Sequence, residues 1–191
     1  MEVFNAIKTR RSINKVKQTK ISNSIINKIL EAGTWAPNHH LTQPWKFFVI
    51  SDKSRDKLGE IMINTLKDNL KKPVNKAELK IKIEKEKNKP LRAPIIIIVT
   101  VIPTKNDKIK EVEEICAGAA AAQNMLLTAH ELGIGGILRT GISAYDKNIK
   151  KFLGIENSDH IIGFIYLGYP NMKNPKGIRI NYKEKTEWRD K

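Results

Sequence analysis

The sequence predicts one domain in which helices cover both faces of a central strand. Its 191 residues, 40% apolar and 29% charged, suffice for one core. Residues 94–101 form an unbroken β-branched run, too short to cross a membrane, that suits a strand buried on both faces. Residues 111–132 form a long helix, rich in small side chains, that can pack on that strand. We therefore expect a single domain over 1–191, with no membrane partner.

Two helices are predicted at the start of the chain. Residues 2–12 are amphipathic over a short stretch and run into two arginines and a serine. Ser22 or Ser24 can cap the second helix, and Gly33 would end it. Residues 34–44 hold two prolines and several turn-forming residues, which predicts an irregular loop.

A strand, a helix and a charged segment are predicted after this loop. Aromatic and apolar residues indicate the strand over 45–50, and Asp52 or Ser54 can begin the next helix. Residues 71–90 carry many charges and almost no large apolar side chains. We expect a solvated helix or a mobile segment there, as an excursion from the domain rather than a boundary.

The second half of the chain continues with helix and strand. The helix over 111–132 begins with acidic residues, which suits the helix dipole, and would end at Gly133. Its small side chains permit close approach of another helix and could support self-association. A short helix over 146–153 and a strand over 161–167 precede a polar tail.

The net charge of +15 raises the question of a nucleic-acid partner. Only seven of the 35 basic residues are arginine, and the lysines are spread along a chain that is also rich in isoleucine and asparagine. A nucleic-acid-binding surface depends on clustering, and the chain shows no RRM, KH or helix-turn-helix pattern. We interpret the charge as a bias in composition, so no specific nucleic-acid partner is expected.

Cysteine and histidine usage points to a cytoplasmic protein without a metal. Cys116 is the only cysteine, and the N-terminus lacks the apolar stretch of a signal peptide, which predicts a reducing compartment. The neighbours of Cys116 would not lower a thiol pKa, so we interpret it as a buried structural residue. The four histidines show no ligand spacing, so no metal site is expected.

Three segments could bind a ligand, and each also has a plain structural explanation. Residues 10–12, with the sequence RRS, offer two guanidinium groups and a hydroxyl to a phosphate, or form a solvated turn. The loop over 34–44 could face a planar polar ligand, or simply connect two elements. Gly135 and Gly136 let the backbone approach a ligand beside Arg139, or form a turn between helix and strand.

Several well-known motifs are missing. The glycines near residue 135 do not form a dinucleotide fingerprint, and no GxxxxGK[ST] sequence occurs. No GxSxG, HExxH or paired-carboxylate arrangement stands out either. The sequence thus argues against Rossmann, P-loop and common hydrolytic enzymes, and an organic cofactor would have to supply any redox chemistry.

The order of these features resembles the nitroreductase family of FMN-dependent, NAD(P)H-oxidising enzymes, above all its small bacterial members. The resemblance covers essentially the whole chain and rests on RRS near residue 10, APNH…QPW, GIGGILRTG and IIGFIYLGYP. It implies an α+β fold, a three-layer α/β/α sandwich with a mixed, mostly antiparallel central sheet. It also implies an intertwined homodimer built on long central helices, with two FMN sites at the subunit interface.

The resemblance also implies which residues bind the cofactors. It implies eight FMN contacts: Arg10, Arg11 and Ser12 at the phosphate and ribityl chain, Leu138, Arg139 and Thr140 at the flavin, and Trp35 and His39 from the partner subunit. It places the end of the central helix near the nicotinamide nucleotide, namely Thr128, Ala129, His130, Glu131, Leu132 and Gly133. No catalytic side chain is expected, because FMN carries the hydride chemistry.

Some positions depart from the family's pattern. They are Trp35, where the family often has a polar residue; Asn14 and Lys15, where larger members have a lysine that reaches the flavin; and Leu138, where close relatives can have tryptophan. Lys176 and Arg179 are loose counterparts of basic residues that hold the phosphate in larger members.

The activity that the resemblance implies is a two-step transfer of electrons. A homodimeric flavoprotein would take a hydride from NADH or NADPH and then reduce a nitroaromatic, a quinone or a similar small electrophilic acceptor by a ping-pong mechanism. The sequence does not choose the acceptor or the nucleotide. Two alternatives stay open: a noncatalytic flavin-binding or regulatory module, and a basic nucleic-acid-binding protein.

Overall fold

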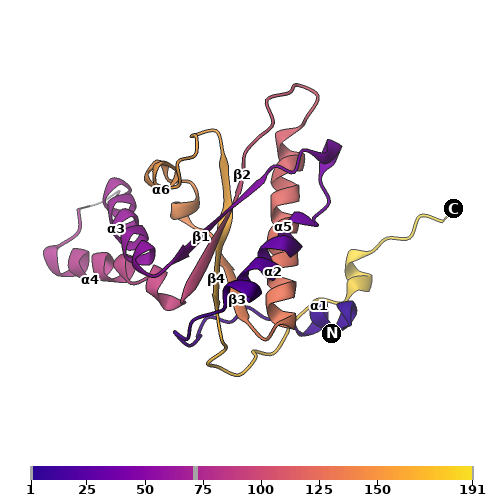
Figure 1. The fold of residues 1–191 in the computed structure, drawn as a ribbon, viewed down its shortest axis with the longest axis horizontal. Helices are drawn as coiled ribbons and strands as arrows, with labels where there is room; N and C mark the ends of the chain where they lie inside the picture. Colours follow the sequence, from indigo (N-terminus) through magenta and orange to yellow (C-terminus); the bar gives the residue numbers. More distant parts are fainter. Residues whose placement is uncertain (1, 71–72, 191) are drawn as a thin grey trace.

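A four-stranded antiparallel sheet forms the centre of the molecule (Figure 1). The computed structural model describes residues 2–70 and 73–190. The strands are β1 (Trp45–Ser51), β2 (Ile95–Val101), β3 (Gly135–Arg139) and β4 (His160–Gly168), in the spatial order β1-β2-β4-β3. All seven residues of β2 are buried, which confirms the central strand predicted from its β-branched run.

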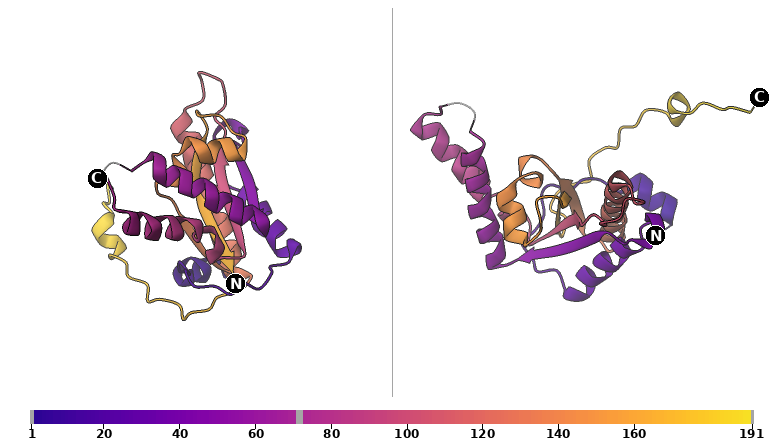
Figure 2. Two further views of the ribbon diagram at one scale, coloured as in Figure 1. Left: turned by 90° about the vertical axis from the view of Figure 1, so that its left-hand side faces the viewer. Right: turned by 90° about the horizontal axis from the view of Figure 1, so that it is seen from above.

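Helices cover both faces of this sheet and make three layers (Figure 2). The first face carries α1 (Val3–Thr9), α2 (Asn23–Thr34) and α5 (Glu111–Glu131), and the second carries α3 (Lys53–Asp68) and α6 (Lys147–Leu153). Residues of β2 alternate between the two cores, because Ile97 packs with α2 and α5 whereas Ile96 packs with α3 and α6. The predicted α+β sandwich is confirmed.

The predicted helix starts are also confirmed. Ser22 caps α2, and its hydroxyl accepts a hydrogen bond from the Ile25 amide at 3.4 Å. Asp52 precedes α3, and Asp146 caps α6. Gly33 lies in the last turn of α2, one residue before the helix ends.

The charged excursion is a helix, α4 (Lys76–Lys87), with no buried residue. It lies along α3, where the bare backbone of Gly59 lets the Lys87 carbonyl approach, since a Cβ at Gly59 would come within 2.5 Å of that oxygen. Of the two structures expected for 71–90, the solvated helix is therefore present over 76–87. Residues 71 and 72 lie outside the described residues.

The glycine-rich segment after α5 is a strand rather than a turn. Gly135 and Gly136 begin β3 at the edge of the sheet, and the chain before α2 packs directly against them. The Ile13 amide donates to the Gly136 carbonyl at 3.1 Å, and a Cβ on Gly135 would lie 2.9 Å from the Ile13 side chain. Among the described residues, the bridge from Ser12 to Gly136 supplies the parallel pairing of this otherwise antiparallel sheet.

Cys116 is exposed, so its interpretation as a buried residue is wrong. Ala117 and Ala121 face the sheet and are buried, whereas Cys116 and Ala119 lie on the outer side of α5. Because small residues occur on every side of this helix, the sequence pattern did not show which side is buried. The outer side of α5 is open to solvent in the isolated chain.

The chain ends in a tail that leaves the body of the domain (Figures 1 and 2). It passes α1, forms one short helical turn over Tyr182–Lys185, and exposes Ile178 and Trp188, each 82% accessible. Across the described residues, none of the helices has the length and apolar character needed to span a membrane.

Candidate cofactor site

Three arginines gather where α1 ends. Arg10 is the first residue after α1, and its pKa is lowered by burial and by the nearby charges of Arg11 and Arg179. Arg179 comes from the tail, so the loose counterpart noted in the sequence does lie beside the RRS segment. A guanidinium group stays protonated in proteins, so the three side chains concentrate positive charge.

A cavity of about 190 Å³ lies against this cluster. Its wall brings together Arg10 and Arg11, the end of α5 at His130, and the start of β3 at Gly135 and Gly136. Among the described residues, none of the lining side chains is acidic. A partly buried cluster of cations without an internal anion suits a phosphate group.

Arg11 has a different role from Arg10 in this structure. Its Nη1 donates to the carbonyls of Lys8 at 2.7 Å and Arg10 at 2.8 Å, and its guanidinium packs on Gly177, where a Cβ would collide with it. These contacts tie the end of α1 to the tail. In the described chain, Arg11 Nε is buried and has no hydrogen-bond partner.

The end of α5 faces two different cavities. His130 and Gly133 line the cationic cavity, whereas Thr128 and Glu131 line a separate one of about 330 Å³ beside Trp35. The six residues expected near the nicotinamide nucleotide are therefore divided. Two of the six pack inward: Ala129 is fully buried, and Leu132 is half-buried against the core.

A cavity of about 450 Å³ surrounds the other end of β3. Leu138, Arg139 and Thr140 line it, and so do Arg92 and Tyr166, which sequence reasoning missed. The Arg139 Cζ lies 5.8 Å from the centre of the Tyr166 ring. In the described chain, Arg139 Nε is buried without a partner, which leaves a donor for a ligand.

Tyr166 forms part of the wall of this second cavity as a neutral phenol. Burial raises its pKa to about 12, so the hydroxyl keeps its proton at any ordinary pH. Lys89, the third cation of this wall beside Arg92 and Arg139, is already paired with Glu86 at 2.5 Å. Besides the hydroxyls of Thr140 and Ser143, the polar groups of this wall that could meet a ligand are Arg92, Arg139 and the Tyr166 hydroxyl.

Both cavities border the edge strand β3, the first on the side of α5, where Leu126 lines it, and the second on the side of α3, where Met62 and Tyr166 line it. Three residues of extended strand, about 10 Å, separate Gly136 at the first cavity from Arg139 at the second. An elongated ligand with an anionic group at one end and a planar polar ring system at the other would reach both cavities by passing the edge of the sheet at β3. The residues present thus fit a flavin mononucleotide.

Trp35 and His39 do not join these residues within one chain. Trp35 is 79% exposed at the end of α2, and His39 Nε2 lies 3.6 Å from Glu113 Oε2 at the start of α5. His130 is near the opposite end of α5, about 25 Å away at 1.5 Å per residue. His39 therefore cannot reach the cationic cavity of its own chain.

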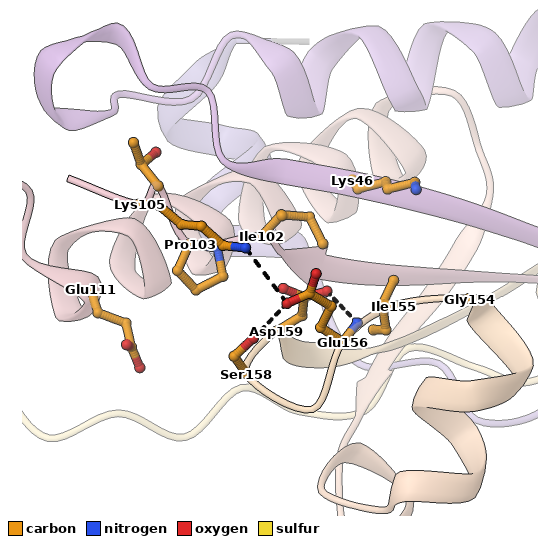
Figure 3. A pocket seen from close by; sticks show the side chains of 11 residues that line it. Lys46, Ile102, Pro103, Lys105, Glu111, Gly154, Ile155, Glu156, Ser158 and Asp159 are labelled. Carbon is orange, nitrogen blue, oxygen red and sulfur yellow. Dashed lines mark hydrogen bonds and ion pairs between the residues drawn. The ribbon is translucent and has the colours of Figure 1, made fainter.

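A larger cavity of about 470 Å³ lies at the far end of the sheet and contains none of the predicted site residues (Figure 3). Two contacts join polar groups of its wall: Lys105 Nζ is 3.9 Å from Glu156 Oε2, and Asp159 accepts from the Glu156 amide at 2.7 Å. Within the described residues, no buried unpaired polar atom belongs to its wall. Metal-ligand clusters of three or more His, Cys, Asp or Glu are absent from the described part of the chain.

Comparison with known proteins identifies the family. The model of the Nitroreductase family matches residues 7–169. The chain belongs to the nitroreductase family. A protein of Escherichia coli that is classed by name with the NAD(P)H nitroreductases is 30% identical over 184 residues, 94% of each chain. A Bacillus subtilis protein of the same class is 31% identical over 167 residues, 86% of this chain and 82% of its own.

Solved structures of the nitroreductase family share this fold. A nitroreductase-like protein from Bacillus cereus superposes with a TM-score of 0.85 at 25% identity, over 100% of this chain and 97% of that one. A Desulfovibrio desulfuricans protein, solved in complex with FMN, has a TM-score of 0.74 at 26% identity, over 99% and 97% of the two chains. The recognition made from the sequence motifs is therefore confirmed.

The cationic cavity is expected to bind inorganic phosphate, and this can be tested by thermal melting. Millimolar inorganic phosphate, at constant ionic strength and with no other ligand bound, should raise the melting temperature, because it binds the folded cluster. Each kcal/mol of binding energy corresponds to about 2–4 °C for a chain of this size. The substitution Arg10→Gln should remove most of this shift.

The matched control is Arg189→Gln, which deletes the same charge from the exposed end of the tail. That variant should keep the full response to phosphate. Equal shifts in the wild type and in Arg10→Gln would show that the cavity is not the anion site.

Proposed function

We propose that the chain is an FMN-dependent oxidoreductase that takes electrons from NADH or NADPH and passes them to a small electrophile such as a nitroaromatic compound or a quinone. The observation that carries this proposal is the pair of cavities along β3, one cationic and one lined by Leu138, Arg139 and Thr140. The FMN complex of the Desulfovibrio desulfuricans relative and the name of the Escherichia coli relative support it.

The residues of this chain would bind and orient the cofactor. Bound FMN would supply the redox chemistry, accepting a hydride from the nicotinamide in one half-reaction and giving it up in the next. Arg10 and Arg179 would hold the phosphate, while Arg11 keeps the end of α1 in place. Arg139 and the Tyr166 hydroxyl would offer positive charge and a donor to the ring system.

No acid or base of the protein is needed for such a transfer. The second cavity contains no paired carboxylates, and its phenol keeps its proton. A noncatalytic flavin-binding module would share both cavities, so the difference lies in turnover. The reduction experiment below distinguishes the two, because a noncatalytic module would bind flavin that stays oxidised.

We also infer that the working form is a homodimer. The outer side of α5 and its surroundings leave apolar side chains in water, among them Val3, Phe4, Ile7, Trp35 and Val112, each at least half exposed. A two-fold axis across α5 would set the start of one helix beside the end of the other. His39 and Trp35 of one subunit could then complete the site of its partner.

The redox role can be tested on the purified protein by absorbance. The protein should show flavin bands, and anaerobic NADH or NADPH should bleach them. Arg10→Ala should lower the flavin content after purification, while Arg189→Ala should not. Flavin that binds but stays oxidised would favour the noncatalytic module, and a protein that FMN cannot reconstitute would contradict the proposal altogether.

The dimer can be tested with a charge placed on the outer side of α5. The wild type should sediment at twice the 21.7 kDa of one chain. Ala119→Arg should give a monomer with weakened FMN binding, because the partner's contribution to each site is lost. Ala77→Arg, on exposed α4, should change neither property, and a wild-type monomer with full FMN affinity would overturn the inference.

A further inference from the structure

We propose that His130 is a ligand of the cofactor phosphate and takes up a proton when that phosphate binds. The inference rests on the proposed function, because it requires FMN in the cationic cavity. It changes the role expected for this residue, which the family resemblance implied to be contact with the nicotinamide nucleotide.

His130 lies in the same cavity as the arginines at the end of α1. It lies in the last turn of α5 and lines the cationic cavity together with Arg10 and Arg11. The cavity beside Trp35, where Thr128 and Glu131 lie, has other walls. His130 is thus grouped with the arginines and not with the rest of the helix end.

The His130 ring is held by a hydrogen bond to Thr9. His130 Nε2 lies 2.9 Å from Thr9 Oγ1, and the Thr9 hydroxyl donates to the Asn5 carbonyl at 2.7 Å. When the single hydroxyl proton goes to Asn5, Nε2 carries the hydrogen of the bond to Thr9. Nδ1 is then the nitrogen that gains a proton when the ring becomes charged.

The charges around the ring set the direction of the coupling. Arg10 and Arg11 face His130 from the end of α1, Arg179 lies beyond Arg10, and Glu131 is its neighbour on α5. Burial and the two arginines lower the pKa of His130 from 6.5, so the ring is neutral at neutral pH. A phosphate dianion in the cavity would offset the arginine charges and raise that pKa.

The sign of the pH dependence follows from these two states. The imidazolium is favoured in the complex and disfavoured without ligand, so binding takes up a proton between the two pKa values. The phosphate monoester also takes up a proton at about pH 6, so the effect of His130 is the difference between the wild type and a variant without the ring. Relative to such a variant, the wild type should gain FMN affinity as the pH falls, by at most about tenfold per pH unit for one proton. Riboflavin lacks the phosphate, so its affinity should not follow this course.

The experiment compares FMN with riboflavin by fluorescence titration of the flavin-free, full-length protein between about pH 5.5 and 8. The variant is His130→Gln, whose amide nitrogen can still donate to Thr9 but cannot take up a proton. The control is His160→Gln at the far end of the sheet, where His160 pairs with Glu111 at 2.7 Å. A second measurement compares the net proton uptake of the wild type and His130→Gln on flavin binding, by calorimetry in buffers of different ionisation enthalpy.

The proposal expects the wild type and His160→Gln to gain FMN affinity relative to His130→Gln as the pH falls. It also expects more proton uptake on FMN binding in the wild type than in His130→Gln, and no such difference with riboflavin. A His130→Gln profile that follows the wild type, or an equal loss for FMN and riboflavin, would overturn it and leave a structural hydrogen bond to Thr9. A wild type that binds neither flavin at any pH would instead refute the proposed function.

Discussion

The contact between the N-terminal segment and β3 determines where every part of the site lies. Ile13 donates to the Gly136 carbonyl, and this approach is possible because Gly135 and Gly136 lack side chains. The contact places the arginines at the end of α1 beside the start of β3. Because β3 runs from Gly135 to Arg139, Arg139 lies at the other end of the same edge strand.

The second constraint is electrostatic. Arg10, Arg11 and Arg179 lie close enough for their charges to interact, and none of the acidic residues in the described chain lines their cavity. Like charges held together in a partly buried place disfavour the folded state unless an anion joins them. The folded chain thus keeps an arrangement that a bound phosphate would stabilise, which is the physical basis of the proposed cofactor site.

Local patterns predicted most of the elements, and tertiary contacts explain the exceptions. The β-branched run of β2, the cap of α2 and the start of α3 after Asp52 are signals within a few residues of each other, and all were confirmed. The short edge strand β3 was missed, because its pairing with β4 and with the N-terminal segment is what makes it a strand. Cys116 was misjudged, because small residues on every side of α5 do not mark a buried face.

The candidate site likewise combines residues that the sequence motifs predicted with residues that only the folded chain brings together. The motif resemblance named Arg10, Leu138, Arg139 and Thr140, and the structure brings them to two cavities along one strand. Arg92 and Tyr166 carry no local signal, since only the folded sheet sets them beside β3. The partner-subunit roles of Trp35 and His39, the homodimer and the cytoplasmic location stay predictions.

The most direct test of the central claim is a crystal structure of the protein with FMN bound. The account predicts the phosphate between Arg10 and Arg179 and the ring system against Leu138, Arg139 and Thr140. It also predicts a symmetric partner whose His39 approaches the same flavin. A flavin in the cavity of Figure 3, or one bound entirely within a monomer and away from Arg10, would contradict it.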